Sequence, residues 1–159
     1  AEQEMNAREL QQAVKDDLTI LFQNSRYPTP GGEKAAVSVF EQNLPMRQTE
    51  DADDPFPYII VRLDSGGIAT QTDPHKVAVI LLIGGYDDNP NNQGHKIVLE
   101  ILEKIQHHYE ETPLLAGQFV FRDPFNWALQ DEESYPYFFG AANLTFDLPA
   151  TRRKWSELV

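Results

Sequence analysis

The sequence Val77-Ala-Val-Ile-Leu-Leu-Ile83 is an unbroken apolar run. Short apolar runs are typical of strands that are covered on both faces, whereas a strand with one wet face alternates apolar and polar residues. The run is far too short to cross a bilayer, which takes about 20 residues in a helix. We therefore expect residues from His75 to Gly84 to form the central strand of a sheet, buried on both faces.

Two segments carry the periodicity of amphipathic helices. From Met5 to Gln23 and again from Gln93 to Glu111, apolar residues recur at spacings of three and four and so form one stripe. Segments that are rich in β-branched and aromatic residues, or that alternate in polarity, predict further strands at 36–40, 58–63, 117–122 and 137–148. The order α-β-β-β-α-β-β predicts an α+β fold in which two helices flank a mixed, mainly antiparallel sheet.

A length of 159 residues suits one domain with one core. We expect residues 1–150 to form that domain and residues 151–159 to form a tail. Within the domain, residues 47–57 are acidic and contain proline, which predicts a surface loop. The glycines of Asp64-Ser-Gly-Gly67 predict a turn at the end of the strand that precedes them.

The chain is strongly acidic, with 25 acidic and 13 basic side chains and a formal charge of −12. Such a charge opposes sequence-independent binding to nucleic-acid phosphates and to anionic membranes. The absence of cysteine excludes disulfides, thiolate catalysis and cysteine-ligated zinc. Because the amino-terminal residues do not resemble a secretory signal, we expect a protein made in a cytoplasm, without membrane contact.

No sequence motif predicts a catalytic, cofactor-binding or metal site. Asp87, Asn89 and Asn91 fall at the first, third and fifth positions of a calcium loop, but Val98 stands where that loop needs its closing glutamate. These residue types are also typical of a turn that caps the following helix. We therefore expect a turn here, and no cofactor in the protein.

Residues 123–136 connect the last two predicted strands and carry Phe125, Trp127, Leu129 and Tyr135. Aromatic residues are enriched at protein interfaces, so these four side chains are candidates for contacts with another subunit. An equally good interpretation is that they fold back as a lid on the core of their own domain.

Trp155 follows the basic residues of Thr151-Arg-Arg-Lys154. On an acidic protein, a basic segment with an aromatic residue is a candidate for docking on an acidic neighbour, and Trp155 joins the predicted interface residues for this reason. The alternative is a disordered terminus, which is the commoner structure of chain ends.

The order of the predicted elements over about residues 5–148 has a counterpart in a known family. These elements are an amphipathic amino-terminal helix, the strand Pro57–Leu63, the strand Val77–Ile83 with the loop after it, the helix Gly94–Tyr109, and two closing strands ending at Leu144–Leu148. In this order and texture the chain resembles the tail terminator proteins of long-tailed bacteriophages, which complete the tail and join it to the head.

The resemblance implies a non-enzymatic structural protein. Members of that family form a hexameric ring that stops polymerisation of the tail tube and then joins the tail to the head. The implied partners are further copies of the chain, the tail tube protein and the head–tail connector protein, while DNA passes through the ring without specific binding. The implied location is the head-proximal end of the virion tail, after assembly in the cytoplasm of the host bacterium.

Two other interpretations stay open. Head-completion and connector proteins have similar size and acidity, so a different structural role in the same assembly is one alternative. The other is a small enzyme or ligand-binding domain that draws carboxylates and His107 or His108 into a pocket from distant segments. Adjacent histidines point about 100° apart on a helix, which does not favour a shared metal ion.

Overall fold

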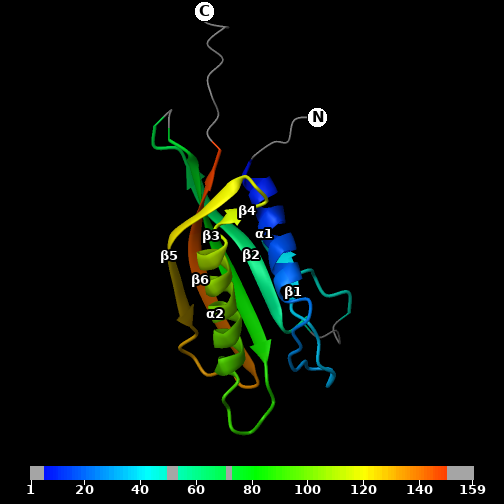
Figure 1. Cartoon of the computed structure of the whole chain (residues 1–159). Coiled ribbons are helices and arrows are strands. Elements are labelled where there is room, and N and C mark those ends of the chain that lie inside the picture. Colours follow the sequence, from blue (N-terminus) through cyan, green and yellow to red (C-terminus); the bar gives the residue numbers. More distant parts are fainter. Residues whose placement is uncertain (1–5, 50–53, 71–72, 150–159) are drawn as a thin grey trace, which may run out of the picture.

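The computed structural model describes residues 6–49, 54–70 and 73–149. In this part of the chain, helices α1 (Ala7–Leu21) and α2 (His95–Glu111) pack on the same face of a six-stranded sheet (Figure 1). The strands are β1 (Ser38–Glu41), β2 (Tyr58–Gly67), β3 (His75–Tyr86), β4 (Leu114–Leu115), β5 (Phe119–Leu129) and β6 (Tyr137–Leu148). The predicted α+β fold is confirmed.

The strands lie in the order β1-β2-β3-β6-β5-β4. Only β1 and β2 run parallel, and every other neighbouring pair is antiparallel, so the sheet is mixed and mainly antiparallel as predicted. Strand β3 contains the long apolar run and pairs along its length with β2 and β6. Its central place in the sheet is also as predicted.

The main core lies between the two helices and the sheet. Helix α1 packs over β1 and β2, and α2 packs over β3, β5 and β6. Burying a large aliphatic or aromatic side chain contributes about 1.5–3 kcal/mol, so this layer dominates the stability of the fold. Its largest fully buried side chains are Leu10, Leu18, Phe22, Ile59, Leu81, Ile83, Ile101, Leu102, Ile105, Tyr109, Phe119 and Phe146.

Helix α1 begins where its sequence supplies a cap. The Asn6 side chain accepts a hydrogen bond of 2.9 Å from the backbone N–H of Glu9, which satisfies one of the free N–H groups of the first turn. On the sheet side of the helix, the buried Gln11 amide donates to the carbonyl of Val61 at 2.8 Å and to the Gln42 side chain at 3.0 Å. These bonds tie α1 to the sheet just beyond the end of β1.

The expectation that both faces of the central strand are buried is wrong. Burial alternates along β3: Val77, Val79, Leu81 and Ile83 face the helices and are buried, while the residues between them are only partly covered. The reason is that both helices lie on one face of the sheet, so the apolar run supplies a core face and a second apolar face without a helix over it.

Two predicted connections are strands. Strand β2 continues through Asp64-Ser-Gly-Gly67, because a bulge between Leu63 and Ser65 lets it resume pairing with β3. Strand β5 likewise continues to Leu129 after an irregularity between Arg122 and Asn126, so the predicted connection 123–136 is reduced to residues 130–136. Neither bulge leaves a periodic signal in the sequence.

Candidate interaction surface

The face of the sheet opposite the helices is called here the open face. Its middle is an apolar row that crosses five strands, because residues paired across neighbouring strands point to the same side. The register places these side chains side by side in the order Phe40, Ile60, Leu82, Ala141 and Ala128. No helix of the described residues covers this row. Ile60 is buried by neighbouring side chains, whereas Phe40, Leu82 and Ala141 are partly exposed and Ala128 is exposed, so contact with another molecule is open mainly at the Ala128 end.

An aromatic cluster extends the apolar row at one end of the open face. Phe56, from the segment before β2, lies over the sheet with ring centroids 5.0 Å from those of Tyr58 and Tyr137 and 6.0 Å from that of Phe139. Tyr86 lies 5.7 Å from Tyr137. Burial raises the pKa of Tyr58, and the Asp54 carboxylate adds to the effect. Part of the open face is thus covered by its own chain.

Beside this cluster the open face is hollowed. The hollow measures about 290 Å³ and is almost wholly apolar. In soluble proteins, large contiguous exposed apolar patches mark interaction sites, and the hollow adds to the apolar area of the open face. The lining residues are Leu82, Ala128, Leu129, Gln130, Phe139, Gly140 and Ala141.

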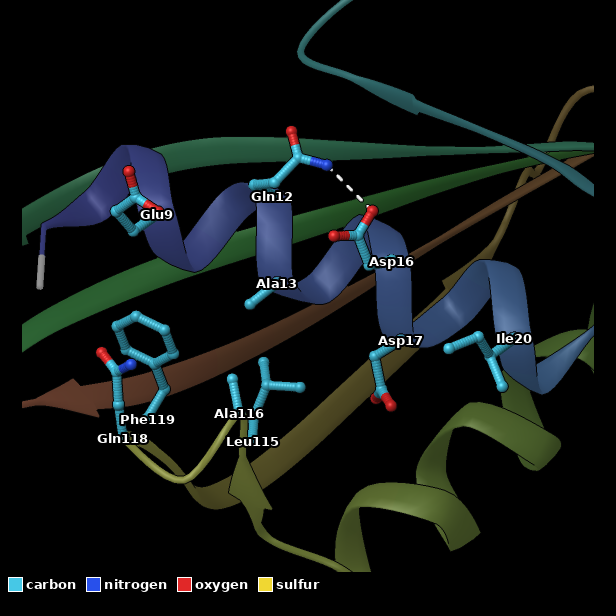
Figure 2. Close-up of a pocket in the computed structure, with 10 residues that line it drawn as sticks. All are labelled: Glu9, Gln12, Ala13, Asp16, Asp17, Ile20, Leu115, Ala116, Gln118 and Phe119. Carbon is cyan, nitrogen blue, oxygen red and sulfur yellow. Dashed lines mark hydrogen bonds between the residues drawn. The ribbon is translucent and has the colours of Figure 1, made fainter. Parts of the chain in front are cut away.

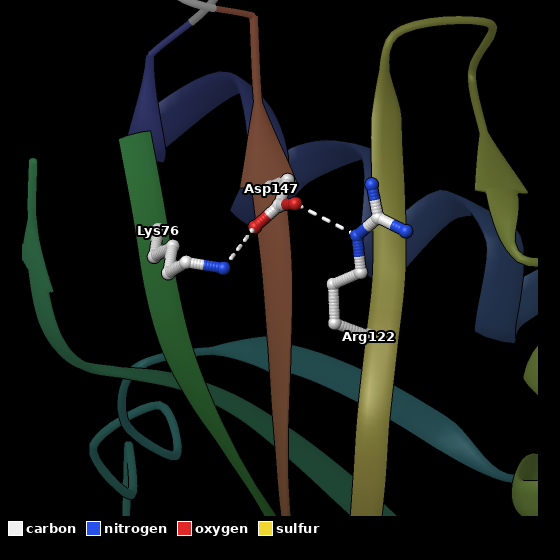
Figure 3. A network of polar contacts seen from close by, with 3 residues as sticks. All are labelled: Lys76, Arg122 and Asp147. Carbon is white, nitrogen blue, oxygen red and sulfur yellow. Dashed lines mark hydrogen bonds and ion pairs between the residues drawn. The ribbon is translucent and has the colours of Figure 1, made fainter. Parts of the chain in front are cut away.

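The other end of the open face is polar. There the Asp147 carboxylate accepts hydrogen bonds from Lys76 Nζ at 3.1 Å and from Arg122 Nε at 2.7 Å, joining three strands (Figure 3). The Asp147 side chain is 8% exposed, but those of Lys76 and Arg122 are 57% and 56% exposed. Burial alone would raise the pKa of Asp147, but the hydrogen bonds and charges of Arg122 and Lys76 outweigh it and hold the pKa below its usual range.

Replacing this carboxylate by an amide, Asp147→Asn, should lower the free energy of unfolding by about 1–2 kcal/mol at neutral pH, because both cations lose a charged acceptor but stay solvated. Since the folded-state pKa is lowered, the stabilisation is complete above the unfolded pKa of about 3.9 and is lost as pH falls through the folded pKa. Urea unfolding of both proteins at pH 7 and down to pH 2 measures this. Thr145→Val, on the same strand, is the control, and a constant difference over the whole pH range would contradict the expectation.

A free stretch of sheet edge borders the apolar hollow. Strand β4 pairs with β5 only at Phe119 and Val120, whereas β5 pairs with β6 as far as Leu129. In the described residues, the outer side of β5 from Asn126 to Leu129 therefore has no neighbouring strand. Such an edge offers backbone donors and acceptors to a strand of another chain.

The predicted interface residues separate into different environments. Phe125 is only 9% exposed and packs in the main core, so the lid interpretation fits it better. Leu129 is half-buried and reaches both the core edge and the hollow. Trp127 and Tyr135 are 44% and 43% exposed, and the Tyr135 hydroxyl donates to the carbonyl of Asp88. Trp155 lies outside the described residues. An interface role for these residues stays a prediction.

The residues of the open face were not among those singled out from the sequence. Ile60, Leu82 and Ala141 lie within segments predicted as strands, where they look like ordinary core positions. The available signal was that residues 58–61 of β2 and 77–83 of β3 are apolar at every position, while the described residues contain two helices to cover them. Phe139 and Tyr137 open the last strand and add to the same surplus of apolar residues.

A groove on the opposite side of the molecule lies between α1 and the turn that joins β4 to β5 (Figure 2). Close to it, the His108 Nε2 and Asp17 Oδ2 atoms lie 2.7 Å apart and join α2 to α1. The Tyr109 hydroxyl is buried beside them without a well-oriented hydrogen bond, and burial followed by the Asp17 charge raises its pKa. No serine, threonine or lysine is among the described residues that line the groove.

The asparagine-rich loop after β3 is a series of turns. The side-chain oxygens of Asp87, Asn89 and Asn91 each accept a hydrogen bond from a backbone N–H two residues further on, at 3.0–3.2 Å. The expectation of turns is confirmed, but the expectation of a side-chain cap on α2 is wrong, because the residue at that position is Gly94. Within the described residues no three His, Asp or Glu side chains converge as a metal site would require.

No protein-family model matches the chain, and no curated protein matches it. Among the described residues, neither helix combines the length and apolarity needed to cross a bilayer. The functional interpretation therefore rests on the surfaces themselves.

Proposed function

We propose that the chain is a virion structural protein of the tail terminator type, which forms an oligomeric ring on the phage tail tube, ends its polymerisation and joins the tail to the head. The observation that carries the proposal is the open face, with its apolar row, its hollow and the adjoining free edge of β5. Contact between subunits through this surface would be favourable, because it would bury apolar area that the monomer leaves in water.

In this proposal neighbouring copies meet through the open face and the β5 edge. Residues Phe40, Leu82 and Ala128 supply apolar area, and the backbone of residues 126–129 supplies hydrogen bonds. The protein is non-enzymatic and needs no cofactor. Its further partners are the tail tube protein and the head–tail connector protein, and its place is the head-proximal end of the tail.

The charge of the chain sets how assembly responds to salt. Each copy carries a formal charge of −12, so copies in a ring repel one another and DNA passing through the ring is not held by its phosphates. Raising the ionic strength from about 0.01 M to 0.15 M shortens the screening length from about 30 Å to 8 Å. We expect the oligomer to become tighter over this range.

Sedimentation velocity across such a salt series, followed by imaging of the largest species for a central hole, tests the proposal. Rings that dissociate as salt rises, or a chain that stays monomeric at high concentration, would contradict it. Adding purified tail tubes then separates a terminator, which binds one tube end, from a head-completion or connector protein, which does not.

A further inference from the structure

The groove between α1 and the β4–β5 turn combines an acidic rim with an apolar floor. It measures about 350 Å³ and is open to solvent. Helix α1 contributes the carboxylates of Glu9, Asp16 and Asp17 to the lining of the groove (Figure 2). The apolar lining residues are Ala13, Ile20, Leu115, Ala116 and Phe119, and none of the lining residues is Lys, Arg or His. Its occupant should therefore be a cationic segment with a large apolar side chain.

The described chain ends beside this groove. Phe119 lines the groove, and the next residue of β5, Val120, pairs with Asp147 of β6. Leu148, the last residue of β6, follows Asp147 directly. The carboxyl end of β6 and the amino end of α1 lie at the same end of the molecule (Figure 1). The chain that continues after Pro149 thus starts next to the groove.

That continuation has the complementary chemistry. Thr151-Arg-Arg-Lys-Trp155 holds three of the 13 basic residues of the chain within three positions, followed directly by one of its two tryptophans. From Glu9 to Ile20 the groove runs along α1 for about 16 Å, at 1.5 Å per residue. Five extended residues span about 16–18 Å, so the segment matches the groove in length.

We propose that residues Thr151–Trp155 dock in this groove on their own chain. The guanidinium and ammonium groups meet the carboxylates of Glu9 and Asp16, and the Trp155 ring packs on the floor near Ile20. A short tether gives a segment an effective concentration in the millimolar range at its own groove, which favours the intramolecular contact over exchange between copies. The inference does not depend on the oligomer proposed above.

Disulfide trapping on the full chain tests the contact, because the protein has no cysteine of its own. The pair Ala13→Cys with Ser156→Cys places one thiol in the groove and one beside Trp155. The control pair, Lys15→Cys with Ser156→Cys, moves the first thiol two residues along α1, about 200° around the helix axis. Under a mild oxidant we expect an intramolecular disulfide in the first pair, formed at least tenfold faster than in the control.

Neutralising the rim supplies an independent readout. Glu9→Gln with Asp16→Asn, in the Ala13→Cys and Ser156→Cys background, should slow trapping about fivefold or more at low salt, since an exposed ion pair changes an equilibrium about two- to fivefold. Glu132→Gln, at the far end of the molecule, should change nothing. Gln12→Cys replaces Ala13→Cys if the latter fails to fold. Equal trapping at Lys15, disulfides formed only between chains, or rates unaffected by the rim charges would each overturn the inference.

Discussion

Ala128→Asp should weaken self-association by a factor of 100 or more while leaving the monomer folded. Ala128 is exposed on the outer strand of the apolar row and lines the hollow of the open face. In the monomer the new carboxylate stays in water and costs little. In the proposed interface it would be buried without a partner, which costs several kcal/mol, and each 1.4 kcal/mol is a tenfold change in the dissociation constant.

Sedimentation of the variant beside the unchanged protein measures this effect. Ser65→Asp is the matched control, because Ser65 is exposed on the same face but pairs with Ala78 towards the polar end, away from the hollow. A circular dichroism spectrum and a thermal midpoint like those of the unchanged protein establish that the fold persists. An Ala128→Asp protein that assembles normally would remove the open face from the proposal.

Phe146→Ala should lower the free energy of unfolding by about 3–5 kcal/mol and the thermal midpoint by about 10 °C. Phe146 is fully buried where β6 meets α2, with its ring 5.4 Å from that of Tyr109 and 6.1 Å from that of Phe121. Both contacts are edge-to-face, a favoured geometry for aromatic pairs. Truncation leaves a cavity that these rings cannot fill without moving.

Phe139→Ala on the same strand is the informative comparison. Phe139 is half-buried on the open face, so its truncation should cost the monomer about 1–2 kcal/mol and weaken self-association instead. Urea unfolding and sedimentation of the two variants should therefore give opposite rankings. If Phe139→Ala destabilises the monomer as much as Phe146→Ala does, the open face belongs to the domain's own core and not to an interface.

Local patterns in the sequence account for most of the elements. The stripes of α1 and α2 place both helices within two residues of their observed ends, since a periodicity of 3.6 residues reflects burial of one face of a helix. The predicted last strand, 137–148, has the bounds of β6, and the alternation of Leu144, Phe146 and Leu148 reflects its second half, where one face is core.

Local patterns in the sequence do not predict the candidate surfaces. The free edge and the hollow exist because β5 passes its bulge and resumes pairing with β6 from Asn126 onwards. A bulge is defined by how two strands pair, so Asp123-Pro-Phe125 looks like a loop when the sequence of one strand is read alone. Phe125 is buried and Trp127, two residues further on, is exposed, a difference that the sequence pattern does not predict.

The sequence by itself determined both helices, the main parts of five strands, the central place of β3 and the acidic charge, because periodicity and composition act within single segments; it did not predict β4 or the continuations of β2 and β5. Only the tertiary structure decided that both helices share one face of the sheet, which leaves Leu82 on an apolar surface and Leu81 in the core. Two neighbouring leucines in one run are chemically alike. Which of them meets a helix depends on layers that form between distant segments, and no local pattern carries that information.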